Sequence, residues 1–298
     1  MSRLVCVHGV GQQVKGEDVL AGEWTPALRD GMRRAGACPE SLPGAGEVGF
    51  AFYGDVFRPP GRTLAVGDAW LAADDLDQYE RDLLAAWWLG AAEADHGVIA
   101  PGAASLARVP GGVQRGLRAL SGSAFFTGVA ERAMLSDLRQ VRLYLEDPQV
   151  RRAARERVAS LVDDATRVLV GHSLGTVVAY EALCAHPEWP VRALVTLGAP
   201  LGIRNLIFDR LQPPPEPSGE GLRGRWPGGV ASWVNVADAG DAVALVKDLC
   251  PAFGPRVECF TVSNGAHAHA VSPYLAARET GAAIMAGLGG QGDPGGPR

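Results

Sequence analysis

One stretch of the chain constrains its fold more than any other. An apolar run over residues 167–170 leads into Gly171-His172-Ser173-Leu174-Gly175, and residues 176–183 follow with the pattern of a helix. This order predicts a buried strand, a sharp turn and a helix that folds back on the strand. The two glycines avoid a collision between strand and helix. Such a turn exposes the serine hydroxyl, so the sequence predicts that Ser173 is a nucleophile for hydrolysis or acyl transfer.

Length and composition favour one α/β domain with insertions. The chain has 298 residues, of which 47% are hydrophobic and 20% are charged, and this is enough for a large core. A net charge of −5 provides no basic surface, so we expect no nucleic-acid partner. No apolar stretch approaches the ~18 residues that cross a membrane. The apolar part of the N-terminus is too short for a signal peptide. We expect a cytoplasmic protein without a transmembrane segment, and its oligomeric state is not set by the sequence.

The five cysteines are scattered along the chain without the spacing of a metal site. Three of them lie in apolar runs and are expected to be reduced core residues. We therefore expect no metal and no cofactor. The cysteines are Cys6, Cys38, Cys184, Cys250 and Cys259.

Short apolar runs alternate with helical patterns along most of the chain. This alternation predicts a mostly parallel six-stranded sheet with helices on both faces. The predicted strands are residues 3–8, 48–53, 167–171, 192–197, 230–236 and 256–262. The predicted helices are residues 17–36, 69–94, 129–146, 148–164, 174–186, 241–249 and 274–287.

Two Gly- and Pro-rich stretches, residues 97–128 and 211–229, are predicted to be loops or insertions. We expect one domain over residues 1–288 and a flexible tail over residues 289–298. Residues 58–130 form a helical and loop insertion that is a possible lid. The apolar side chains available to a lid, which can equally pack the helix on the sheet, are Trp70, Trp87, Trp88 and Leu89.

A serine nucleophile requires a histidine base and an acid that orients it. Of the histidines after Ser173, His186 is too far along the helix to reach back. His267 and His269 follow the last predicted strand, and we favour His269 because it lies at the junction with the final helix. His267 stays the alternative, as base or as a residue at the rim of the site.

The acid is expected just after the fifth predicted strand, where ligand sites form in open α/β sheets. Asp238 and Asp241 both lie there. Asp241 can also be a helix N-cap and Asp238 a turn residue. We favour Asp241 and keep Asp238 as the alternative.

Two backbone N–H groups usually stabilise the oxyanion of acyl transfer. One belongs to the residue after the nucleophile, Leu174. For the second we choose Val10, with Gly11 next, because the glycine-rich loop after the first strand can turn its amides toward the site. His8 is expected to be a structural hydrogen-bonding residue beneath that loop.

Taken together, His8-Gly9-Val10-Gly11, the pentapeptide around Ser173 and Leu197-Gly198-Ala199-Pro200 resemble the α/β-hydrolase superfamily. The likeness is closest to bacterial lipase/esterase-like serine hydrolases. The segment from Trp233 to Val243 resembles the acid-bearing strand and loop of lipase-like members, and this likeness is carried over to Asp241. Because the chain begins at the strand with the oxyanion loop, the resemblance implies the reduced, six-stranded form of the α/β-hydrolase fold.

From these residues we expect a serine hydrolase that cleaves a carboxylic ester or lipid-like acyl bond in a small-molecule substrate. The alternatives are an acyltransferase or thioesterase of the same fold and a non-catalytic interaction protein that retains the fold.

Overall fold

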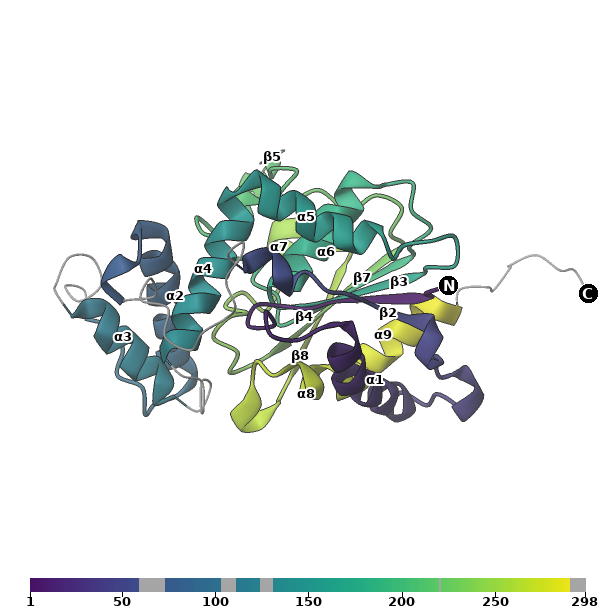
Figure 1. Cartoon of the computed structure of the whole chain (residues 1–298), viewed down its shortest axis with the longest axis horizontal. Helices are drawn as coiled ribbons and strands as arrows, with labels where there is room; N and C mark the ends of the chain where they lie inside the picture. Colours follow the sequence, from purple (N-terminus) through teal and green to yellow (C-terminus); the bar gives the residue numbers. More distant parts are fainter. Residues whose placement is uncertain (59–72, 103–110, 124–130, 220, 290–298) are drawn as a thin grey trace, which may run out of the picture.

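A computed structural model describes residues 1–58, 73–102, 111–123, 131–219 and 221–289 of the chain, which adopts an α/β fold (Figure 1). Six strands form one sheet in the order β2-β1-β3-β4-β7-β8. All its neighbouring strands are parallel, so the expected mostly parallel sheet is entirely parallel. Each predicted strand is confirmed to within two residues. The strands are β1 (Leu4–Val7), β2 (Val48–Ala51), β3 (Val168–His172), β4 (Ala193–Leu197), β7 (Ser232–Asp238) and β8 (Val257–Val262).

Helices cover both faces of the sheet, as expected. Successive strand residues point to opposite faces. In β1, Leu4 and Cys6 pack in the core under α1 (Glu17–Arg34), α8 (Val271–Ala276) and α9 (Arg278–Gly289). Val5 and Val7 pack in the core under α5 (Pro148–Ala159) and α6 (Leu174–Ala185). Figure 1 shows these two helical layers on opposite sides of the strands. Burial on both faces explains why the strands are almost continuously apolar.

A third group of helices extends beyond the sheet on the left of Figure 1. It consists of α2 (Gln78–Ala94), α3 (Gly112–Ser121) and α4 (Glu131–Glu146), and α2 contacts both of the others. The N-terminus of α2 is a capping box, in which the Asp77 carboxylate accepts from the Glu80 N–H at 2.8 Å and the Glu80 carboxylate accepts from the Asp77 N–H at 3.1 Å. This cap explains why α2 starts at Gln78, after the first described residues of the helix predicted over residues 69–94.

The buried Glu80 also joins α2 to α4. Its carboxylate lies 3.2 Å from Arg139 Nε and 2.9 Å from Arg142 Nε. Burial opposes ionisation of Glu80, but the hydrogen bonds from Arg142 and Arg139 lower its pKa. The two helices are therefore held together by a charged cluster as well as by apolar packing.

Both stretches predicted as loops or insertions contain regular structure. Helix α3 lies within residues 97–128, because burial of Leu117 and Leu120 outweighs the poor helix propensity of its glycines. Within residues 211–229, β5 (Glu216–Ser218) and β6 (Gly221–Arg223) form a separate antiparallel pair. A helix at α3 is consistent with the helical and loop insertion expected over residues 58–130, whereas the β5–β6 pair was not expected.

The predicted helix over residues 241–249 was also wrong, since a helix begins only at α7 (Cys250–Phe253). Backbone carbonyl groups that would accept hydrogen bonds within a helix accept them from side chains instead. The Asn235 amide donates to the Lys247 carbonyl at 2.9 Å, and the Lys247 ammonium donates to the Asp241 carbonyl. The predicted helix over residues 274–287 is two helices, α8 and α9, separated by an extended Ala277.

Some expectations lie outside the described residues. These are the lid segments over residues 59–72, 103–110 and 124–130, including Trp70, and the tail from residue 290 onward. Trp87 and Trp88 of α2 are buried, whereas Leu89 is exposed. In the described parts of the chain, every helix is too short or too polar to span a bilayer.

Candidate active site

Ser173 occupies a sharp turn between β3 and α6. Its backbone has φ 53° and ψ −128°, a conformation that costs a residue with a Cβ atom about 1–3 kcal/mol. A Cβ at Gly175 would lie 2.2 Å from the Val7 carbonyl oxygen, and one at Gly9 would lie 2.6 Å from Ser173 Cβ. Glycine is thus required at both positions, and backbone hydrogen bonds of Ser173 with Leu197 and Thr176 hold the strained turn in place.

His269 and Asp241 form a hydrogen-bonded pair. His269 Nδ1 lies 2.7 Å from Asp241 Oδ2, and because a carboxylate only accepts, the histidine nitrogen donates. In the neutral imidazole this leaves Nε2 as the nitrogen able to take up a proton. His269 also borders the same two cavities as Ser173. A histidine that is oriented by a carboxylate therefore lines the same two cavities as the serine.

Asp241 is held by four donors. Its Oδ1 accepts from the N–H groups of Val243 at 2.8 Å and Ala244 at 3.0 Å, and Oδ2 accepts from Tyr274 Oη at 2.7 Å as well as from His269. Burial would raise the pKa of this carboxyl, but the charge of His269 and the hydrogen bonds from His269, Tyr274 and Ala244 lower it to about 2. Asp241 is therefore a fixed negative charge at neutral pH.

The alternative acid, Asp238, has other partners. Its Oδ1 accepts from the Gly240 N–H at 2.7 Å, and its Oδ2 accepts from the Asn264 N–H. It thus fastens the loop after β8 to the end of β7. The alternative base, His267, lies in a short 3₁₀ turn within this loop and borders the open cleft.

His172, the residue before Ser173 in the pentapeptide, supports the backbone of His269. Its Nε2 donates to the His269 carbonyl at 2.9 Å. Burial and the neighbouring His269 lower the pKa of His172 to about 3, so the ring is neutral and stays a donor. Sequence analysis did not assign it a role, because nothing in the spacing brings residue 172 to residue 269.

Two adjoining cavities meet at Ser173. An open cleft of about 290 Å³ is also bordered by Gln12, Lys15 and Trp24. A narrow apolar pocket of about 40 Å³ lies toward α2 and α4. Its apolar lining consists of Val10, Leu83, Trp87, Val141, Leu174, Pro200, Ile207 and Val243. The site therefore offers a small apolar space on one side of the serine and a larger, mixed one on the other.

The candidate oxyanion donors differ in their surroundings. Leu174 is the first residue of α6, where an N–H has no acceptor within the helix. Val10 borders both cavities. The Gly11 N–H donates to Gln140 Oε1 at 3.2 Å, so this amide is occupied. The arrangement favours Leu174 and Val10 over Gly11.

His8 is a structural residue, as expected. Its Nε2 accepts from the Tyr53 N–H at 3.1 Å, and its Nδ1 donates to the Gly9 carbonyl at 2.7 Å. Burial lowers the pKa of His8 to about 4, which keeps the ring neutral. The two hydrogen bonds fix the loop that carries Val10.

Asp137 of α4 is a residue that sequence analysis missed. It borders both cavities together with Ser173 and His269, and its Oδ1 lies 3.4 Å from Gln140 Nε2. Burial raises the pKa of Asp137 to about 7. A single acidic residue in an amphipathic helix is typical of a solvent-facing position, so the sequence carries no signal for it.

In comparisons with known proteins, the chain matches no family model and no curated protein.

Proposed function

We propose that this protein is a serine hydrolase with an α/β-hydrolase-like fold that cleaves carboxylic esters through an acyl-enzyme. One observation carries the proposal. A histidine bonded at 2.7 Å to a buried aspartate borders the same cavities as a serine on a strained strand-to-helix turn. Nucleophile, base and orienting acid are the components that such chemistry requires.

In the proposed reaction, Ser173 Oγ attacks the ester carbonyl while His269 Nε2 takes the hydroxyl proton. The N–H groups of Leu174 and Val10 stabilise the oxyanion of the tetrahedral intermediate. The intermediate collapses, the alcohol leaves with the proton from His269, and the acyl group stays on Ser173. A water molecule, deprotonated by His269, then attacks this ester and releases the acid. Asp241 stabilises the imidazolium in both halves of the reaction.

The two cavities suit the two parts of an ester substrate, its acyl group and its alcohol. The narrow pocket of about 40 Å³ suits an acyl chain of only a few carbons, while the larger cleft suits the leaving alcohol. A lid rich in tryptophan would instead favour long acyl chains. Because the narrow pocket is small and Trp87 is part of its lining, we propose a preference for short acyl groups such as acetyl or butyryl.

A fluorophosphonate probe tests the proposal directly, because it reacts with activated serines. We expect the wild type to be labelled on Ser173 and Ser173→Ala to be unlabelled. Ser160→Ala, which removes an exposed hydroxyl on the far end of α5, is the matched control and should label like wild type. Folded wild-type protein that resists labelling, or equal labelling of Ser173→Ala, contradicts the proposal.

A further inference from the structure

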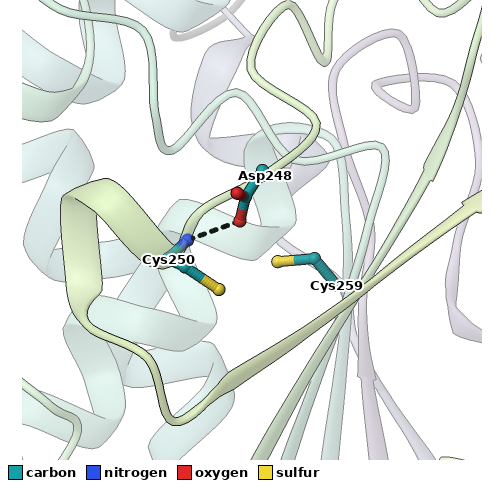
Figure 2. Close-up of side chains that lie close together, drawn as sticks. All are labelled: Asp248, Cys250 and Cys259. Atoms are coloured by element: carbon teal, nitrogen blue, oxygen red, sulfur yellow. Dashed lines mark hydrogen bonds between the residues drawn. The ribbon is translucent and has the colours of Figure 1, made fainter.

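Three side chains near the start of α7 converge outside the Ser173 site. Asp248 precedes the helix, Cys250 is its first residue and Cys259 lies in the adjacent strand β8. The two sulfurs and a carboxylate oxygen lie within 4.8 Å of one another. Figure 2 shows the sulfurs pointing toward each other across the space between helix and strand, with the carboxylate beside them. Sequence spacing indicated no metal site, yet the fold gathers three potential ligands.

Backbone groups hold these ligands in place. The Cys250 N–H donates to Asp248 Oδ1 at 2.9 Å, and the Leu249 N–H donates to Cys259 Sγ at 3.3 Å. N–H donors to ligating sulfur and carboxylate oxygen are typical of the outer shell of metal sites, because they stabilise negative charge on the ligand atoms. Asp248 is exposed and both cysteines are half-buried, so an ion can enter from solvent.

We propose that Cys250, Cys259 and Asp248 bind a thiophilic divalent cation of the Zn²⁺ class, with water as the fourth ligand. Two sulfurs and one carboxylate match the preferences of Zn²⁺ and Cd²⁺ and do not suit Mg²⁺ or Ca²⁺, which prefer all-oxygen sites. Zn–S bonds of about 2.3 Å place tetrahedral ligands ~3.8 Å apart. A contraction of the cluster by roughly 1 Å achieves this, and it requires only small side-chain rotations.

The site has a structural consequence. It joins α7 to β8 at the end of the irregular segment that starts at Asp241. A cation bound there would cross-link this segment to the edge of the sheet. It would stabilise the folded protein by an amount that rises with the logarithm of the cation concentration above the dissociation constant. The proposal is independent of the proposed esterase activity.

Cadmium titration of the reduced, tag-free, full-length protein tests the site, because a cadmium–thiolate bond gives an ultraviolet charge-transfer band. We expect one equivalent of Cd²⁺ to saturate the band, Zn²⁺ to displace it and Mg²⁺ to leave it unchanged. The double variant Cys250→Ser/Cys259→Ser should lose the band. Asp248→Asn, a change at an exposed side chain, should keep the band and weaken binding by about tenfold or more.

The controls are Cys184→Ser, which removes a half-buried thiol elsewhere, and Ser173→Ala; both should bind Cd²⁺ like wild type. Circular dichroism establishes that each variant is folded. A wild type without the band, or a band of equal strength in the double variant, overturns the proposal. So does reduced protein that takes up no Cd²⁺ and loses two thiols in glutathione disulfide buffer, since the pair is then a redox site.

Discussion

The two cavities around Ser173 have two walls, and different kinds of interaction hold each wall in place. On the sheet wall, the Ser173 N–H donates to the Leu197 carbonyl at the end of β4. The Asp241 carboxylate accepts from two backbone N–H groups of the segment after β7 and from two side chains. On the helical wall, the side chains of α2 and α4 are positioned by apolar packing and by the ion pairs of Glu80. Hydrogen bonds from the backbone fix an atom more firmly than contacts between long side chains, because long side chains have more rotamers. We infer that the sheet wall supplies the chemistry and the helical wall supplies substrate selection.

The largest expected effect is on the sheet wall, at the orienting acid. Asp241→Asn should lower kcat by about 10⁴-fold, because an amide cannot hold the histidine tautomer or stabilise its charged form. Steady-state hydrolysis of p-nitrophenyl acetate measures this. Asp238→Asn is the matched control, since it alters a neighbouring buried aspartate that binds only backbone amides. We expect it to lower thermal stability more than kcat.

The same assay separates the two histidines. His269→Ala should match Asp241→Asn in its loss of kcat, and His267→Ala should stay within about tenfold of wild type, as expected for a rim residue. If the two variants behave in the opposite way, His267 is the base and the bond between His269 and Asp241 does not serve catalysis.

The next effect is on the stability of the helical wall. Glu80→Gln leaves Arg139 and Arg142 without their buried carboxylate partner, and we expect a loss of about 1–3 kcal/mol in the free energy of unfolding, measured by urea denaturation. Asp30→Asn is the control, because its ion pair with Arg33 is exposed on both sides and should contribute less than ~0.5 kcal/mol. Equal losses in both variants would mean that the charged cluster does not hold α2 on α4.

A smaller effect concerns the choice of acyl group. Trp87→Leu should widen the narrow pocket and raise the ratio of kcat/KM for hexanoate over acetate esters by about tenfold. Leu83→Ala provides a second enlargement of the same pocket. Leu89→Ala, on the exposed side of the same helix, should leave the ratio unchanged. An unchanged ratio in both pocket variants would show that the helical wall does not select the acyl group.

A final prediction concerns the pH dependence of stability. Burial raises the pKa of Asp137 to about 7, whereas an unfolded aspartate titrates near 4. The folded chain then binds a proton that the unfolded chain releases. Its stabilising contribution is complete below about pH 4 and is lost as the pH rises to about 7. The slope is at most ~1.4 kcal/mol per pH unit.

Unfolding of wild type and Asp137→Asn across this range measures that contribution. The stability of wild type relative to the variant should fall as the pH rises from 4 to 7. Asp164→Asn, at an exposed position, controls for the loss of one charge. A difference that stays constant with pH would show that Asp137 is ionised in the folded protein and faces solvent.

The local sequence pattern was sufficient to predict the strands of the sheet and the turn at Ser173. Each strand buries both faces, so its apolar run is a strong signal. The segment after Asp241 was misassigned because its sequence resembles a helix start, whereas in the fold it is held by contacts with Asn235 and Lys247. Helix α3 was missed for the opposite reason, since burial of Leu117 and Leu120 compensates for weak propensity.

The sequence by itself determined the parallel α/β architecture and a short set of candidate residues, because strand periodicity and glycine-bounded turns depend on near neighbours in the chain. Only the tertiary structure decided that Asp241, and not Asp238, is bonded to His269. It also placed Asp137 at the cleft and brought Cys250 beside Cys259. These pairings join residues whose separation along the chain carries no information about distance in space, so they emerge only once the sheet has set the order of its strands and the helices have packed on it.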